Sequence, residues 1–332
     1  MPSLVRFMRL CACKAKLLCG GSKVKMGKLL GLADAIQRHV PDGALVFIGG
    51  FGHCVPFAAG HELIRQGRKG LTLCRTGTDI LFDQLIGAGC VAKVIFGYLG
   101  NPGVGISHSF RRAVDSDSIA VEEWTNFTLL LRLHAGRIGV PFLPTRALLV
   151  GDIPKASAET RKITCPFTGE TLSAIPALLP DVALIHAQRA DEDGNVQMWG
   201  IDGDSREGAL ASRAVIATVE EIVSREVIRA TPERTMVPAH RVAAVCHVPG
   251  GAHPSYVQGY YTRDDEHYVH YDRVSRKPDD LSAYLDRHVR QVADREAYLK
   301  SLDVGALERI GFSRPSSSAD AAPDEKAAEA RR

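Results

Sequence analysis

The sequence contains no long hydrophobic run and almost no excess charge, and both absences limit the class of protein that it encodes. Because no stretch of about 18 consecutive apolar residues exists, we expect no membrane-spanning helix. The 41 Lys and Arg residues nearly balance the 38 Asp and Glu residues, for a net charge of +3 over 332 residues. That balance gives no electrostatic argument for nucleic-acid binding. The hydrophobic content of 45% is that of an ordinary globular protein.

The sequence also lacks the residue spacings that typically bind metals. Its eight cysteines form no C-x-x-C pair, and its twelve histidines form no H-x-x-x-H or H-E-x-x-H pattern. We therefore predict no metal site. Most of the cysteines lie within apolar runs, where a free thiol behaves as a small hydrophobic group. This use of cysteine fits a reducing compartment, and we expect a cytoplasmic protein.

Both ends of the chain differ in composition from the middle. Residues 1–25 carry six basic side chains and no acidic one, but no apolar segment of signal-peptide length. We interpret them as a disordered extension or as untranslated sequence ahead of a start at Met26, with a targeting peptide as the alternative. Residues 313–332 are rich in Ser, Ala, Pro and charge and are expected to form a disordered tail. Residues 26–312 are then expected to form a single domain.

One glycine-rich segment, Gly49-Gly50-Phe51-Gly52-His53, directly follows the apolar residues 44–48. The pattern predicts a turn between a strand and a helix that Pro56 starts. Glycines let backbone N–H groups face a ligand, so the turn is a candidate site for an anion or for an oxygen that gains negative charge. Val55 stands where a dinucleotide-binding G-x-G-x-x-G motif needs its last glycine, so that motif is a poor match. The alternative is a tight turn that binds nothing.

Between the two ends, patterns of strands and helices alternate. Strands are predicted at 44–48, 71–75, 91–98, 119–122, 147–151, 182–187, 214–219 and 241–248. Helices are predicted at 26–38, 56–67, 78–88, 106–115, 125–138, 205–213 and 283–302. Near-continuous apolar strands are typical of burial on both faces, so we predict an α/β fold with an open, mainly parallel sheet and helices on both faces. The turn signal at 191–195 predicts one antiparallel hairpin.

Glycine-rich and polar segments follow three of these strands, where α/β sheets bind ligands. They are residues 49–56, 97–105 and 122–127. We expect the three to meet at one site. The alternative is that each is an independent connection, with Asn126 serving only to cap the helix at 125–138.

These segments resemble family I coenzyme A transferases, and in particular the A (alpha) subunit of the glutaconate CoA-transferase group. The segments that carry the resemblance run in order along residues 26 to 303: Gly49–His53, Leu85–Gly89, Gly100–Gly105, Glu122–Thr128, Gly139–Pro144, Cys165–Glu170, His186–Asp191 and Gly250–Pro254. The resemblance implies the CoA-transferase fold, with a coenzyme A thioester as substrate and no permanently bound cofactor.

The resemblance also implies a division of labour between two different chains. In this family the B subunit's glutamate attacks an acyl-CoA, becomes a glutamyl thioester and passes CoA to a second carboxylic acid. The S-E-N/E-x-G-like segment that carries this glutamate is absent here. A B subunit is therefore the expected partner, in an A2B2 assembly. Within this chain Glu123, beside Glu122, is the candidate catalytic carboxylate, and a structural or solvated role is the alternative for both.

Asn126 is the residue that we expect to stabilise the oxyanion. In the single-chain ketoacid transferases that the sequence resembles, a glutamine at the equivalent place donates its side-chain N–H to the oxyanion, and asparagine keeps this donor on a shorter stem. Related ring-opening hydrolases of steroid degradation carry a catalytic glutamate near this segment. Aligned back from Pro141–Pro144, that position is Asn126, which favours transfer, although a slip of the alignment would bring Glu123 closer. Ring hydrolysis is therefore the first alternative function.

A non-catalytic ligand-binding module is the second alternative, although the helix-turn-helix that a regulator would normally add is not evident. The remaining residues that we expect to bind CoA or the acyl group are Gly49, Gly50, Phe51, Gly52, His53, Gly100, Asn101, Gly103 and Ser107. A hydrogen-bonded structural role is the alternative for His53. Ser107 opens a predicted helix, whose N-terminus favours an anion. Residues 253–261 are interpreted as a loop that covers the partner interface or the substrate entry.

Overall fold

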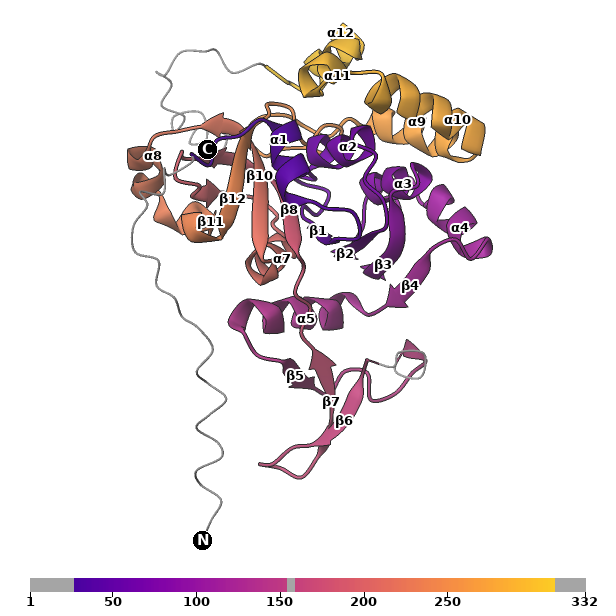
Figure 1. Ribbon diagram of the computed structural model, residues 1–332, viewed down its shortest axis with the longest axis vertical. Helices are drawn as coiled ribbons and strands as arrows, with labels where there is room; N and C mark the ends of the chain where they lie inside the picture. Colours follow the sequence, from indigo (N-terminus) through magenta and orange to yellow (C-terminus); the bar gives the residue numbers. More distant parts are fainter. Residues whose placement is uncertain (1–26, 154–158, 314–332) are drawn as a thin grey trace, which may run out of the picture.

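The computed structural model describes residues 27–153 and 159–313, and its centre is a nine-stranded sheet (Figure 1). Seven of the strands described are parallel and lie in the order β12-β10-β8-β1-β2-β3-β4. They are β1 (Leu45–Ile48), β2 (Leu71–Gly77), β3 (Val91–Tyr98), β4 (Ala120–Glu123), β8 (Val182–Ala190), β10 (Ala214–Ile222) and β12 (Val242–His247). Every residue of β8 is buried, as the apolar runs predict for a central parallel strand.

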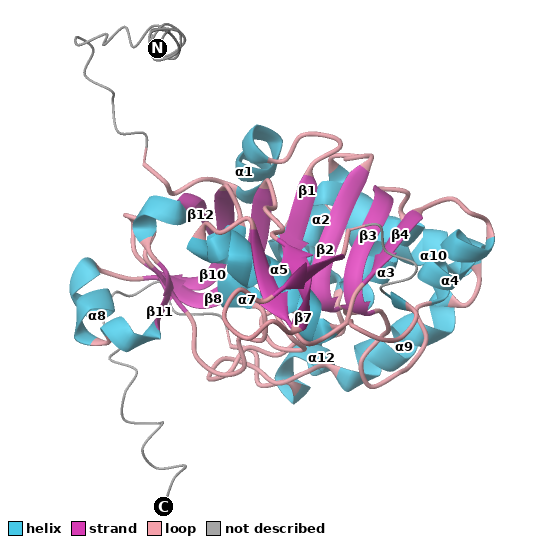
Figure 2. Ribbon diagram, turned by 90° about the horizontal axis from the view of Figure 1, so that it is seen from below, coloured by secondary structure: helices cyan, strands magenta, loops and turns pink. Residues whose placement is uncertain are grey.

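Helices cover both faces of this sheet (Figures 1 and 2). One face carries α1 (Leu32–His39), α2 (Phe57–Arg65), α3 (Ile80–Gly87), α4 (His108–Asp115), α9 (Asp265–Ser275) and α10 (Pro278–Leu285). The other face carries α5 (Asn126–Ile138) and α7 (Ser205–Ala211). Each face has its own buried apolar cluster, around Leu63 and Leu85 on the first and around Leu129 and Leu133 on the second. The predicted α/β fold is thereby confirmed.

Antiparallel strands occur in two places. The predicted hairpin is present: β8 turns at Asp191–Asn195 into β9 (Val196–Gln197), which pairs with β11 (Thr235–Val237). A separate three-stranded sheet, in the order β5-β7-β6, consists of β5 (Phe142–Thr145), β6 (Arg161–Thr164) and β7 (Thr171–Pro176). The prediction missed this second sheet because β5 and β6 bury little of their length and show no apolar alternation.

The other helices are α8 (Arg225–Ala230), α11 (Arg295–Ser301), α12 (Val304–Arg309), the 3₁₀ turns Pro232–Arg234 and Ala239–Arg241, and the π-helical turn Asp286–Arg290. No helix in the described part of the chain combines the length and the apolar character that crossing a bilayer requires. The predictions for residues 1–25 and 314–332 lie outside the described residues.

Three predicted elements were wrong. Residues 147–151 form turns in place of a strand, and Leu148 has a left-handed φ of 58°, which a strand does not allow. The first helix begins only at Leu32, because Leu29 pairs with Val245 of β12. The helix predicted at 283–302 is interrupted by the π-helical turn and resumes as α11. Helix α9 was not predicted at all.

Candidate active site

The seven parallel strands end at one edge of the sheet, and the three predicted loops lie along that edge. The Gly49–Pro56 turn follows β1, the 99–107 loop follows β3, and Asn126 begins α5 after β4. Phe51 reaches across to β2: a Cβ on Gly77 would lie 2.9 Å from the Phe51 ring. Asn126 lies against β3, because a Cβ on Gly97 would lie 2.3 Å from its Oδ1. The turn and Asn126 therefore reach neighbouring strands of the same edge.

Two glycines of the first turn are closely packed, and one of them, Gly50, also has a left-handed backbone conformation. Gly50 has a φ of 86°, and a Cβ there would lie 2.7 Å from the carbonyl oxygens of His53 and Cys54. A Cβ on Gly49 would lie 3.0 Å from Ile185 of β8. A larger residue at Gly50 would therefore distort the turn, whereas one at Gly49 would require a small shift of Ile185.

Most backbone N–H groups of this turn already have acceptors. Gly49 N donates to Leu184 O at 2.9 Å, Gly50 N to Ser205 Oγ at 2.8 Å, and Phe51 N to His53 O at 3.1 Å. Within the described residues the Gly52 N–H has no protein acceptor, while the Gly52 carbonyl accepts from Ser255 Oγ at 2.7 Å. The Gly52 N–H is therefore available to a substrate oxygen. The N–H groups of Gly50 and Phe51 are not, because they already donate to protein atoms.

His53 is fully buried and holds the turn in place. Its Nε2 accepts from the Gln258 amide at 3.2 Å, so its Nδ1 carries the proton and donates to Ile201 O at 2.8 Å. Burial lowers the pKa of His53, which keeps the ring neutral. This geometry matches the structural alternative for His53 and aims neither ring nitrogen at the open edge.

Asn126 is the first residue of α5, and Thr125 is the residue that caps this helix. Thr125 Oγ1 accepts from Thr128 N at 3.0 Å, and Thr128 Oγ1 accepts from Thr125 N at 3.1 Å. Within the described chain the exposed side chain of Asn126 makes no hydrogen bond. Its amide is therefore available to a ligand, and the helix does not depend on it for a cap.

The two neighbouring glutamates differ in their surroundings. Glu122 contacts Lys93 Nζ at 2.6 Å, accepts from Trp124 Nε1 at 2.8 Å and pairs with Arg132. Burial opposes ionisation of Glu122, but the hydrogen bonds from Lys93 and Trp124 and the charge of Arg132 outweigh it and lower its pKa. Glu122 is thus held as a structural carboxylate, whereas Glu123 is exposed at the end of β4.

The second glycine loop is closed by its own contacts. Asn101 and Gly105 exchange two backbone hydrogen bonds of 2.8 Å, and Gly100 N donates to Thr78 Oγ1 at 3.2 Å. Gly103 lies beneath the Arg263 guanidinium. The hydroxyl of Ser107 is bound to Asp83, which also accepts the Ser109 N–H at the start of α4 at 2.8 Å. Ser107 and Asn101 are both buried, so their side chains support the loop.

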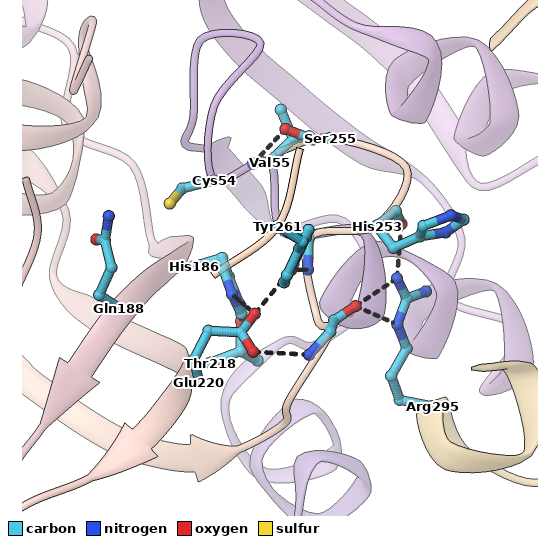
Figure 3. A network of polar contacts seen from close by, with 12 residues as sticks. Cys54, Val55, His186, Gln188, Thr218, Glu220, His253, Ser255, Tyr261 and Arg295 are labelled. Carbon is cyan, nitrogen blue, oxygen red and sulfur yellow. Dashed lines mark hydrogen bonds and ion pairs between the residues drawn. The ribbon is translucent and has the colours of Figure 1, made fainter. Parts of the chain in front are cut away.

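A buried carboxylate lies behind the first turn (Figure 3). Glu220 of β10 accepts from Tyr261 at 2.7 Å and from Gly250 N at 2.8 Å, and it contacts His186 Nε2 at 2.8 Å. These bonds hold the 248–264 loop whose Ser255 binds Gly52. Burial and the charge of Glu220 raise the pKa of the nearby Cys54 thiol well above its usual range, so the thiol stays protonated.

Sequence reasoning missed these supporting residues. Ser205 and Ser255 reach the turn across 155 and 203 positions of the chain, and no local pattern reports such a contact. The only sequence feature that pointed to this region was the segment 250–254. It is one of the segments that resemble CoA-transferases, and it adjoins the loop predicted at 253–261. The structure confirms that residues 253–261 form a loop and shows that it packs on the glycine turn.

These features define an α/β protein whose candidate site, at the carboxyl edge of a parallel sheet, presents amide donors. The family model described as coenzyme A transferase matches residues 30–247, which is more than half of the chain. The chain therefore belongs to the coenzyme A transferase family.

Three comparisons show which members of the family it is similar to. It is 44% identical over 272 residues, or 81% of this chain and 96% of the relative, to the A subunit of 3-oxoadipate CoA-transferase from Pseudomonas knackmussii. The crystal structure of glutaconate CoA-transferase from Acidaminococcus fermentans matches with a TM-score of 0.81 and 33% identity, covering 85% of this chain and 95% of that one. The cholesterol ring-cleaving hydrolase IpdA subunit of Rhodococcus jostii is 29% identical over 76% of this chain and 89% of the relative. The hydrolase alternative is thus less well supported than transfer.

Proposed function

We propose that this chain is the A subunit of a heteromeric CoA-transferase, which moves CoA between an acyl-CoA and a carboxylic acid. A B subunit supplies the nucleophilic glutamate, and this chain supplies oxyanion stabilisation and part of the pocket. The observation that carries the proposal is the Asn126 amide, which has no hydrogen-bond partner among residues 27–153 and 159–313. The neighbouring carboxylate on the same edge, Glu122, is instead bound to Lys93 and Arg132. A carboxylate is a weak nucleophile, so each tetrahedral intermediate needs such donors.

The surface around the site supports a partner. Apolar side chains with 45–55% of their surface exposed lie at or beside the carboxyl edge: Phe51, Tyr98, Ile106, Phe127 and Ile201. An apolar rim of this kind is typical of a surface that another protein covers. We propose that the B subunit covers it in a cytoplasmic A2B2 assembly and brings its glutamate toward Asn126 and the Gly52 amide.

The two amides have distinct parts in this mechanism. When the glutamate attacks the thioester carbonyl, the carbonyl oxygen becomes an oxyanion, and the Asn126 N–H donates to it. The same donor acts again when the second carboxylic acid attacks the glutamyl thioester, because an oxyanion forms at each addition step. The Gly52 N–H is placed to hold a carboxylate or carbonyl oxygen of the acyl group.

The test is to co-express the chain with the adjacent reading frame and to screen the complex for CoA transfer across 3-oxoacids, dicarboxylates and steroid-derived acids. The 3-oxoadipate pair comes first because the relative at 44% identity carries that name. Transfer of CoA from an acyl-CoA to such an acid is the expected result. Ring opening of a steroid-derived CoA thioester without transfer would support the hydrolase, and binding without turnover would support a non-catalytic module. Either outcome would contradict the proposal.

A further inference from the structure

Three metal-ligating side chains lie together behind the site, on the α9 side of the molecule. His253, Asp264 and His267 each present one ligand atom, and these atoms lie within 4.8 Å of one another. These residues are 1%, 6% and 8% exposed, respectively. We propose that this cluster, His253–Asp264–His267, is a binding site for one divalent transition-metal ion of the zinc class.

The orientation of the two histidines supports this assignment. His253 Nδ1 bonds to Tyr298 at 2.9 Å, and His267 Nε2 bonds to Tyr284 at 2.7 Å. Each ring thus has one nitrogen fixed by a phenol group, which leaves the other for an ion. Metal-ligating histidines typically have their second nitrogen fixed in this way.

Asp264 supplies the third ligand from a fixed position. It caps α9 by accepting from His267 N at 3.0 Å with Oδ1, and its Oδ2 lies 3.0 Å from His253 Nε2. In the metal-bound state the ion takes the place of the proton between Nε2 and Oδ2. His253 then carries its proton on Nδ1 and donates it to the Tyr298 oxygen, so the ring stays neutral.

The donor set selects the class of ion. Two imidazole nitrogens and one carboxylate oxygen suit Zn²⁺ and its neighbours Co²⁺ and Ni²⁺ better than Mg²⁺ or Ca²⁺, which prefer oxygen ligands. Bonds of about 2.0–2.1 Å place tetrahedral ligand atoms roughly 3.4 Å apart. The His253–Asp264 pair is already this close, at 3.0 Å, and the ligand atom of His267 lies within 4.8 Å of both.

An ion has a route to the cluster and a source of a fourth ligand. Asp264 and His267 line a surface groove of ≈ 570 Å³ that also contains the acidic residues Asp265, Glu266 and Asp303. These three carboxylates are paired with Arg263 or Arg309, so the groove provides a path for the ion rather than excess negative charge, and water from it completes a tetrahedral site. The buried cation beside the cluster, Arg295, is directed to the carbonyl oxygens of Gly250 and His253.

The sequence did not predict this site because its ligands do not lie at a regular spacing. His253 belongs to the loop that holds the glycine turn, whereas His267 lies in the first turn of α9. An ion at this site would therefore link that loop to α9. None of its three ligands is among the residues proposed to act on the substrate.

The test is metal content. The full chain, purified with its partner, is stripped with a chelator, dialysed against Zn²⁺ or Co²⁺, and assayed by atomic emission and by the visible absorption of tetrahedral Co²⁺. We expect about one ion per chain, and an affinity at least about 100-fold weaker in His267→Phe, which keeps an aromatic ring but removes a ligand. The matched control is His270→Phe, on the same helix and groove, which should bind as wild type does.

A second variant guards against misfolding. Asn caps a helix about as well as Asp, so Asp264→Asn should keep α9 while losing the charged ligand and at least about 10-fold in affinity. Wild-type protein that takes up no stoichiometric Zn²⁺ at micromolar concentrations would overturn the site. Equal uptake by His267→Phe and wild type would overturn it as well, because the ion would then lie elsewhere.

Discussion

At the scale of single residues, the candidate site depends on two N–H donors, the Asn126 side chain and the Gly52 backbone, that have no acceptor within the described residues. The Asn126 amide has no partner within the described chain, and Thr125 relieves it of any capping role. The sequence singled out Asn126 as an oxyanion donor with helix capping as the alternative, and the structure assigns the cap to Thr125. The sequence could not show that the N–H of Gly50 is already bonded, because its acceptor, Ser205, comes from a distant part of the chain.

Substitution of Asn126 tests the oxyanion role. Asn126→Ala should lower kcat roughly 10²–10³-fold with little change in KM, since the donor acts only as charge develops. Asn126→Gln should retain more activity because it keeps the donor, and Asn126→Asp should be at least as poor as Ala because it repels the oxyanion. Thermal unfolding should be nearly unchanged in all three. Near-normal kcat in Asn126→Asp would reject the role and direct attention to Glu123 and Gly52.

At the scale of elements, the alternation of strands and helices was predictable and the supporting contacts were not. Buried parallel strands such as β8 are recognisable by continuous apolar sequence. The β5-β7-β6 sheet is not recognisable in this way, because its strands are defined by their pairing with one another rather than by buried apolar side chains. The 248–264 loop is held by Glu220 and packs on the glycine turn. Its sequence has no regular apolar spacing, so only the three-dimensional contacts show its role.

Glu220 is predicted to be a main stabiliser of this loop. Glu220→Gln keeps the shape but points an N–H group at one of the three donors, Tyr261, Gly250 N or His186. We expect a loss of about 1–3 kcal/mol in the free energy of unfolding. Tyr261→Phe removes one donor and should cost less, about 1 kcal/mol. Denaturant titration measures both, and equal stability of Glu220→Gln and wild type would contradict the network.

Buried histidines predict a loss of stability in acid. His61 of α2 is buried and bonds to Gln84 at 2.9 Å, and burial, aided by the charge of Arg295, lowers its pKa well below 6.5. Below pH 6.5 the unfolded chain therefore binds a proton that the folded chain does not, so stability falls as pH falls. His61→Gln keeps a donor for Gln84 and should reduce this slope by up to about 1.4 kcal/mol per pH unit. An unchanged slope would show that other groups titrate.

At the scale of the whole molecule, the chain forms a folded unit whose apolar rim is proposed to meet a partner. Family membership was already evident in the order of motifs, and the 0.81 TM-score confirms the fold.

The rim can be tested without disturbing the fold. Phe127→Glu places an acidic residue in the first turn of α5, where it favours the helix, so the isolated chain should remain as stable as wild type. Association with the B subunit should weaken roughly 10-fold or more, because a charge would be buried in the interface. Val269→Glu, at a half-exposed position on α9, is the control and should assemble normally. Analytical ultracentrifugation of the mixed subunits decides between these outcomes.

The most direct test of the central claim is to locate the covalent intermediate. The reconstituted complex is incubated with acyl-CoA, reduced with borohydride to trap the glutamyl thioester, and digested for mass spectrometry. We predict the reduced glutamate on the B subunit, and none on this chain whether it is alone or in the complex. An adduct on a glutamate of this chain, Glu123 above all, would contradict the account.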